Sequence, residues 1–372
     1  MSRRILITGG AGFIGSHLAD QLLSRGCHVR VLDSLVRQVH GDSGPDYLNA
    51  EIDFVRGDLR DPSVVRRALR GIDVVYHFAA AVGVGQSMYQ IHAYTSINSV
   101  GTAVLLEALA AKPVEKLIVA SSMSIYGEGL YRGSDGSRRV VAERTLEQLR
   151  NAVWDFTAEA GEPLEPIATP ESKPPSLSSV YALTKYDQER MCLMVGRAYR
   201  IPTVALRFFN VYGPRQALSN PYTGVLAIFA SRYLNDNPPL IFEDGLQKRD
   251  FVSVHDVVQA CLLCLDTPGM AMNESVFNVG SGQAYTIREL AERIAHALGK
   301  EDIEPQITGK YRVGDIRHCF ADISLARACL NYTPKVSLEQ GILELAEWLE
   351  GRSALDRVES ASAELAQRGL TL

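Results

Sequence analysis

The sequence has 372 residues, which exceeds one typical domain but fits a single large α/β unit with an added lobe. Hydrophobic residues make up 46% of it and the formal net charge is −5, so it can bury a core and gives no reason to expect a nucleic-acid partner. No run approaches about 18 apolar residues, and the first apolar run ends at Ile7, so we expect no membrane span, no signal peptide and a cytoplasmic protein.

Short β-branched runs alternate with helical patterns through the first half of the chain. Strands are predicted at 4–8, 28–32, 53–56, 74–77, 117–120 and 203–207. Helices, with apolar residues every three or four positions, are predicted at 16–25, 63–69 and 100–111. Strands separated by helices indicate βαβ units with right-handed crossovers, and therefore a doubly wound parallel sheet of the α/β class. Such a sheet binds its ligands at the carboxyl ends of the strands.

The pattern is interrupted between residues 128 and 175 and resumes afterwards, so we interpret this segment as an insertion. After residue 215 prolines break the pattern, and a strand at 275–279 followed by a helix at 287–298 indicates a smaller lobe that closes over the sheet. The expected organisation is a first domain at 1–215 that contains the insertion, a smaller lobe at 216–350, and a loosely attached tail at 351–372.

Six cysteines are scattered along the chain rather than arranged as a disulfide framework. Cys261 and Cys264 have CxxC spacing, but they lie in an apolar helical stretch without a second pair or nearby histidines. We therefore expect reduced, mostly buried thiols and no metal site.

Residues 8–15 read Thr-Gly-Gly-Ala-Gly-Phe-Ile-Gly and lie between a predicted strand and a predicted helix. Gly9 allows the tight turn, Gly12 lets the backbone approach a pyrophosphate, and Gly15 permits close packing of helix on strand. The helix N-terminus offers free N–H groups to the phosphates. Asp33 closes the next strand, where a carboxylate binds both ribose hydroxyls and repels a 2′-phosphate. The pattern predicts binding of NAD in preference to NADP, and a tight turn without a nucleotide is the alternative.

Tyr181 and Lys185 are four residues apart, so on a helix the phenol and the ammonium share a face. A phenol with a pKa near about 10 is a poor base at neutral pH. A nearby ammonium and a positively charged nicotinamide would both favour the phenolate and lower that pKa. Ser122 follows a predicted strand and would hydrogen-bond a substrate hydroxyl during proton transfer. A chance Tyr–Lys pair and a turn-capping serine are the structural alternatives.

Together these motifs resemble the extended short-chain dehydrogenase/reductase superfamily, in particular its NAD-dependent nucleotide-sugar epimerases and dehydratases. The similarity runs from residue 3 to residue 350, apart from the insertion. Further matching motifs are Gly57-Asp58-Leu59-Arg60-Asp61, His77-Phe78-Ala79-Ala80, Asn98, Arg207-Phe208-Phe209-Asn210-Val211-Tyr212-Gly213-Pro214-Arg215, Arg249-Asp250-Phe251-Val252, His255-Asp256-Val257, Asn278-Val279-Gly280 and Gly314-Asp315-Ile316-Arg317.

The resemblance implies a Rossmann domain that binds NAD and a role for each matched residue. Tyr181 would be the catalytic base, Ser122 its hydroxyl partner and Lys185 the ligand of the nicotinamide ribose. The implied cofactor-binding residues are Gly9, Gly12, Phe13, Ile14, Gly15, Asp33, Asp58, Leu59, Ala79, Ala80, Asn98, Tyr181 and Lys185. The implied ligands of a nucleoside-diphosphate sugar are Ser122, Ser124, Asn210, Arg215, Arg249 and Arg317. Guanidinium forks suit a permanently charged diphosphate.

The residue type at position 123 distinguishes two kinds of enzyme in the superfamily. The 4,6-dehydratases carry Thr-Asp-Glu where this chain has Ser122-Met123-Ser124, and a methionine cannot donate or accept a proton. The resemblance therefore implies a 4-epimerase, in which Tyr181 takes the O4 proton, the C4 hydride passes to NAD, and the 4-keto sugar turns over before the hydride returns. No metal is needed for this chemistry. A reductase or dehydrogenase with net redox turnover and a non-catalytic NAD sensor are the alternatives from other classes.

Two features depart from the hexose 4-epimerases of the superfamily. The 128–175 insertion makes the spacing from Ser122 to Tyr181 much longer than usual, and it acts either as a lid or wall that selects the sugar or as a peripheral or subunit-contact element. Val82 stands where many UDP-galactose epimerases have a lysine near the nicotinamide, so one cationic contact to the cofactor is missing.

The insertion and the segments 207–216 and 220–224 are most similar to a bacterial group of dTDP-L-rhamnose 4-epimerases. UDP-glucose/galactose and UDP-glucuronate 4-epimerases remain the alternative substrate classes. The superfamily also implies a homodimer, which would pair through the predicted helices at 100–111 and 181–199.

Overall fold

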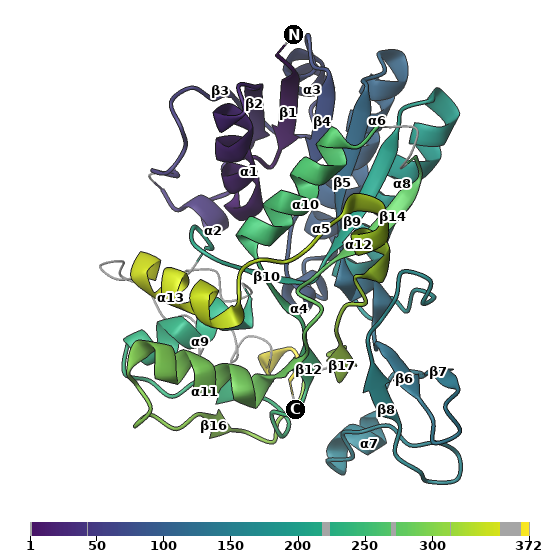
Figure 1. The fold of residues 1–372 in the computed structure, drawn as a ribbon, viewed down its shortest axis with the longest axis vertical. Helices are drawn as coiled ribbons and strands as arrows, with labels where there is room; N and C mark the ends of the chain where they lie inside the picture. The colour runs from purple at the N-terminus through teal and green to yellow at the C-terminus, as the bar shows by residue number, and fades with distance from the viewer. Residues whose placement is uncertain are drawn as a thin grey trace.

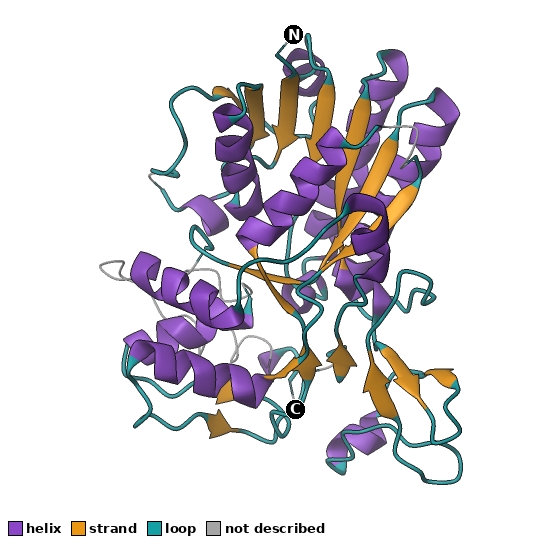
Figure 2. Cartoon of the chain, viewed as in Figure 1, coloured by secondary structure: helices purple, strands orange, loops and turns teal. Residues whose placement is uncertain are grey.

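The computed structural model describes residues 2–42, 44–217, 224–268, 273–312, 314–349 and 366–371. These residues form a large parallel sheet between two layers of helices, a smaller lobe and an inserted antiparallel sheet (Figure 1, Figure 2). The α/β class and the doubly wound sheet expected from the sequence are confirmed. In this part of the chain no helix is both long and apolar enough to cross a membrane.

The main sheet has seven strands, and every neighbouring pair is parallel. In spatial order they are β14 (Ser275–Val279), β9 (Thr203–Phe208), β5 (Lys116–Ser122), β4 (Val74–His77), β1 (Arg4–Thr8), β2 (His28–Asp33) and β3 (Asp53–Arg56). Because both faces are covered, β5 and β9 are buried along their whole length, which explains their nearly continuous apolar sequence.

Two helical layers cover this sheet. One layer has α1 (Phe13–Ser24), α10 (Val254–Asp266) and α12 (Ser324–Leu330), and the other has α3 (Pro62–Ala68), α6 (Gly101–Ala111) and α8 (Val180–Tyr199). Successive residues of β1 alternate between the layers: Ile5 and Ile7 pack with the first, and Leu6 packs with the second. Each fully buried side chain of this kind contributes about 1.5–3 kcal/mol.

The smaller lobe has its own core between three helices, α9 (Val225–Leu234), α11 (Ile287–Leu298) and α13 (Leu338–Leu349). Its short strands are β10 (Asn210–Tyr212), β11 (Leu240–Ile241), β12 (Lys248–Arg249), β13 (Phe251–Ser253), β15 (Tyr285–Thr286), β16 (Gln306–Ile307) and β17 (His318–Cys319). The insertion contributes β6 (Leu130–Arg132), β7 (Arg138–Val140), β8 (Glu165–Ile167) and α7 (Leu146–Arg150). Lobe and insertion both lie beyond the carboxyl ends of the main strands (Figure 1).

The remaining short elements are α2 (Arg37–His40), α4 (Val84–Ser87), α5 (Ile91–Tyr94), a π-helical turn η1 (Thr95–Val100) and a 3₁₀ turn η2 (Met123–Tyr126). The turn η1 ends at Val100, where the sequence predicted a regular helix to begin, and α6 follows it from Gly101. Single π-helical turns of this kind often mark functional sites.

One detail differs from the expected organisation. The strand at 275–279 is an edge strand of the main sheet and pairs with β9, so the second half of the chain is not a separate lobe throughout. Of the tail, residues 366–371 are described: Thr371 pairs with Arg312, and the Arg368 guanidinium lies 4.2 Å from the Tyr89 ring centroid. Most of the segment 220–224 lies outside the described residues. All six cysteines are described and are free thiols, with Cys261 and Cys264 in the core.

Candidate active site

The glycine turn between β1 and α1 has the shape that a dinucleotide requires. Gly9 has φ +69°, and a Cβ there would lie 2.8 Å from the Ala79 backbone. A Cβ on Gly15 would lie 2.6 Å from the Gly9 carbonyl oxygen. A Cβ on Gly12 would meet only that same oxygen, at 3.3 Å, and no side chain caps α1, which leaves its first N–H groups for a ligand. Phe13 and Ile14 form the first turn of α1.

Asp33 ends β2 beside this turn. Its carboxylate accepts hydrogen bonds from the Ala11 N–H (3.1 Å) and the Leu35 N–H (2.9 Å), which fixes its position. His40 approaches it at 3.7 Å. A carboxylate held here suits a ribose diol and disfavours a phosphate, as the sequence predicts.

Several predicted cofactor residues frame this edge of the sheet. Ala79 donates its N–H to Thr8 at the end of β1, and Asn98, in η1, both donates to and accepts from the backbone of Ala81. The Asn98 amide also donates to Thr184 on α8 at 3.0 Å. Asn98 therefore ties the 79–82 segment, which includes Ala80, to the helix of Tyr181, and its part in cofactor binding stays a prediction.

Asp58 and Leu59 lie farther out along this edge. Hydrogen bonds from Arg60 hold the pKa of Asp58 below its usual range. Leu59 is buried and packs against Gly101 at the start of α6. A direct contact of either residue with the adenine stays a prediction.

The four predicted polar residues of the reaction centre come from β5, η2 and α8. Ser122 ends β5 and its hydroxyl accepts from the Ser124 hydroxyl at 2.8 Å. Tyr181 lies in the first turn of α8, which begins because the Ser179 side chain caps it by accepting from the Ala182 N–H. The phenol of Tyr181 lies near the Ser122 side chain, which acts to lower the pKa of the phenol. The structure therefore brings together the predicted base and the predicted hydroxyl, which the insertion separates in the sequence.

The electrostatics around Tyr181 differ from the expectation. Lys185 donates to the Ala120 carbonyl and to the Gln188 side chain, both at 2.7 Å, and burial lowers its pKa to about 8. Burial raises the pKa of Tyr181, and the hydrogen bond to Ser122 opposes this increase. Without cofactor, the serine rather than the lysine therefore favours the phenolate.

The substrate side of the site lies between η2 and the lobe. The Asn210 amide donates to the Asp250 carbonyl at 2.9 Å and lies 3.7 Å from the Met123 sulfur. Arg249 donates to the carbonyl oxygens of Ile316 and Arg317, and its guanidinium lies 4.0 Å from the Asp315 carboxylate.

Arg312 also reaches Asp315, at 2.8 Å. It was not among the predicted site residues, although its position two residues before the Gly314-Asp315 motif was a usable signal. The guanidinium groups of Arg249 and Arg312 thus both lie near the Asp315 carboxylate.

The other two predicted arginines are engaged elsewhere. Arg215 pairs with Asp20 of α1 at 2.7 Å and lies over the ring of Tyr47, beside the glycine turn. The Arg317 guanidinium is fully buried among carboxylates, namely Asp155, Glu243 and Asp244. Both groups thus have anionic partners within the chain, and their role as ligands of a substrate diphosphate stays a prediction.

A family model described as the NAD dependent epimerase/dehydratase family matches residues 5–280. The chain belongs to this family. It is 36% identical over 352 residues to a Burkholderia thailandensis protein named dTDP-L-rhamnose 4-epimerase, with 93% of this chain and 95% of that protein covered.

Two solved structures of UDP-glucose 4-epimerases share the fold at 32% identity. One is from Thermotoga maritima with UDP-glucose, has a TM-score of 0.76 and covers 93% of this chain and 98% of that one. The other is from Thermus thermophilus in complex with NAD, has a TM-score of 0.73 and covers 94% and 99%. The superfamily resemblance, the enzymatic character and NAD as cofactor are thereby confirmed.

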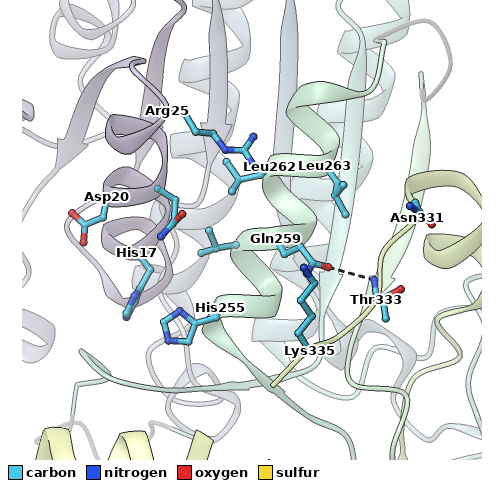
Figure 3. A pocket seen from close by; sticks show the side chains of 12 residues that line it. His17, Asp20, Arg25, His255, Gln259, Leu262, Leu263, Asn331, Thr333 and Lys335 are labelled. Carbon is cyan, nitrogen blue, oxygen red and sulfur yellow. Dashed lines mark hydrogen bonds between the residues drawn. The ribbon is translucent and has the colours of Figure 1, made fainter. Parts of the chain in front are cut away.

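A separate cavity of about 660 Å³ opens between α1 and α10 (Figure 3). Its walls include His17, His255 and Lys335, and none of the residues predicted for cofactor or substrate lines it. The reaction centre predicted for this epimerase/dehydratase family member lies elsewhere, at the carboxyl edge of the sheet.

Asp33 should set the cofactor preference of this family member. We expect NAD to bind more tightly than NADP, and Asp33→Ser to weaken NAD binding by about 10- to 100-fold, because charged hydrogen bonds to the ribose are lost. Titration calorimetry with both cofactors measures this. A wild-type preference for NADP would overturn the assignment.

Ser122 should control both the rate and the pH dependence. Ser122→Ala removes a hydrogen bond that favours the phenolate, so the pKa of Tyr181 should rise and the low-pH limb of the kcat/KM profile should move to higher pH. We also expect kcat to fall by about 100-fold or more, because a donor to the reacting oxygen is lost. A reduced rate with an unmoved limb would show that Ser122 does not act on the base.

Proposed function

We propose that this chain is an NAD-dependent nucleoside-diphosphate-sugar 4-epimerase. The observation that carries the proposal is the proximity of the Tyr181 phenol to Ser122, with the apolar residue Met123 next to Ser122 in the chain. With NAD as the hydride acceptor, one base and one hydroxyl suffice to oxidise and reduce a sugar at C4. Dehydration needs a further acid and base at the position of Met123, which offers neither.

Each residue of the site has a separate role in the proposed reaction. Tyr181 removes the proton from the sugar O4, and the Ser122 hydroxyl donates to that oxygen as its carbonyl character grows. Lys185 holds the ribose next to the ring. When bound, NAD supplies a hydride acceptor whose positive charge favours the phenolate. After the keto sugar has turned over, the hydride would return to the other face of C4 while Tyr181 returns the proton to O4, and the enzyme is ready for another cycle.

The substrate we propose is dTDP-L-rhamnose, with UDP-glucose/galactose and UDP-glucuronate as the alternatives. The support is the 36% identity to the Burkholderia thailandensis relative over nearly the whole of both chains. Incubation with a panel of dTDP-, UDP- and GDP-sugars, followed by NMR of the products, tests it. Inversion at C4 of one sugar without net formation of NADH supports the proposal, and stoichiometric NADH would replace it with a dehydrogenase.

Arg249 and Arg312 are the proposed ligands of the substrate diphosphate. Both guanidinium groups lie at Asp315, on the lobe side of the site, and both retain N–H donors beyond the bonds described above.

We also propose that the protein is a homodimer in the cytoplasm. Val100 at the end of η1 and three α8 residues, Leu183, Met194 and Tyr199, are each about half exposed. Helices α6 and α8 pack side by side, so these side chains could form one subunit contact. Reduced thiols, four of them buried, fit that compartment. Sedimentation velocity would detect the dimer, and Leu183→Glu should dissociate it.

A further inference from the structure

The insertion contributes a buried arginine to the edge of the proposed diphosphate site. Arg144 precedes α7, and its side chain is 3% exposed. Its Nη2 lies 2.9 Å from a Glu243 oxygen of the lobe and donates to the Asp315 carbonyl oxygen at 3.1 Å. Its Nε lies 3.8 Å from Glu128. A charge this deeply buried is tolerated only with such partners.

Three guanidinium groups therefore surround Asp315. Burial alone would raise the pKa of this carboxyl, but Arg312, Arg249 and Arg144 together hold it below its usual range. Arg312 and Arg249 belong to the lobe, whereas Arg144 comes from a segment more than a hundred residues earlier in the chain. Arg144 thus links the insertion to the lobe arginines. It donates to the Asp315 backbone carbonyl, and the Asp315 carboxylate lies near Arg249 and Arg312.

A second buried arginine joins the same two parts of the chain. Arg317 of the lobe contacts Asp155 of the insertion at 2.8 Å and Asp244 at 2.6 Å. The rings of Trp154 and Tyr311 lie 6.4 Å apart across the same boundary. Moving the insertion away would break the ion pairs of Arg317 with Asp155 and of Arg144 with Glu243, and breaking buried ion pairs is costly. These contacts favour a fixed wall over a mobile lid.

One side-chain nitrogen of Arg144 is available for a further hydrogen bond. Its Nη1 is buried, and no residue in the described part of the chain accepts a hydrogen bond from it. An unpaired buried N–H is unfavourable, and an oxygen of a bound ligand would satisfy it.

We propose that Arg144 is a positioning residue for the nucleoside diphosphate: it holds Asp315, and thereby Arg249 and Arg312, in the arrangement that binds the diphosphate. This inference rests on the proposed function, which assigns those two arginines to the substrate. In this proposal the insertion contributes to the substrate site and is not a purely peripheral element.

The test compares Arg144→Met with Arg139→Met, an exposed arginine of the same insertion that pairs with Asp135. Calorimetry with dTDP and UDP measures the site without any reaction. For Arg144→Met we expect the Kd of the nucleoside diphosphate and the KM of the sugar substrate to rise by about 10- to 100-fold. We expect kcat and NAD content to change little and Tm to fall, because a buried ion pair is lost, whereas Arg139→Met should match the wild type in every measurement.

Asp155→Asn is the second variant, in case Arg144→Met does not fold. Asp155 is 61% exposed, so its replacement endangers folding less, yet it weakens the hold of the insertion on Arg317. A raised KM with unchanged kcat is expected here too. Folded variants that bind dTDP and UDP as the wild type does would overturn the positioning role alone. A wild-type protein that binds neither nucleotide and converts no nucleotide sugar would overturn the proposed function as well.

Discussion

Tyr181→Phe should lower turnover by about 100- to 10,000-fold, the range expected when a general base is lost. The phenol bonds Ser122 at the carboxyl end of β5, where a sugar hydroxyl would complete the arrangement. Only a hydroxyl hydrogen and oxygen are removed, so the fold and the glycine turn should be unaffected. Stopped-flow or coupled assays of C4 inversion measure the loss, and the NAD content of the purified protein shows that the cofactor still binds.

Tyr186→Phe is the matched control, because it makes the same change on α8, five residues farther along. We expect near-normal turnover from it. If both variants retained wild-type activity, Tyr181 would not be the base, and the proposed chemistry would need a different proton acceptor.

Arg207→Met should have the largest effect on stability. Arg207 makes two hydrogen bonds to Glu189, at 2.9 and 2.7 Å, and a third to the Tyr126 hydroxyl, and both charged side chains are buried. Removing the guanidinium leaves a buried carboxylate without its counter-charge, which costs about 3–5 kcal/mol. Denaturant titration measures the free energy of unfolding, and the loss should appear as a lower midpoint.

The control is Arg132→Met in the insertion, where the ion pair with Glu165 is long, 3.8 Å, and exposed. We expect a change below about 1 kcal/mol there. Equal effects of the two substitutions would contradict the buried ion pair. Glu189 also accepts from the Ser121 hydroxyl, so Arg207→Met should in addition loosen the strand end that carries Ser122.

The parts of the fold that the sequence predicted well are those set by local pattern. The strands at 4–8, 53–56 and 74–77 and the helix at 287–298 have the predicted bounds, since apolar periodicity and caps fix them. The pairing of β14 with β9 was missed because it joins segments about 70 residues apart, and no local signal reports it. The short insertion strands were missed because three residues are too few to show a period.

The reaction centre was predictable for a different reason. Ser122 and Tyr181 occupy fixed places in the architecture, a strand end and the first turn of a helix, so motif and context locate them. The roles of the arginines were harder to predict, because the role of a guanidinium depends on which groups it contacts in the folded chain. Two of the partners of Arg317 lie 73 and 162 residues away in sequence, and Asp315 lies 171 residues from Arg144. The pKa of Tyr181 could not be inferred either, since it depends on where the Lys185 ammonium actually points.

The fate of the hydrogen at C4 tests the central claim most directly. A nucleotide sugar deuterated at C4, converted in ordinary water and examined by NMR, should yield the C4 epimer with the deuterium still on C4, because the hydride leaves and returns within one site. Loss of the label to solvent would contradict this, as would its accumulation in free NADH.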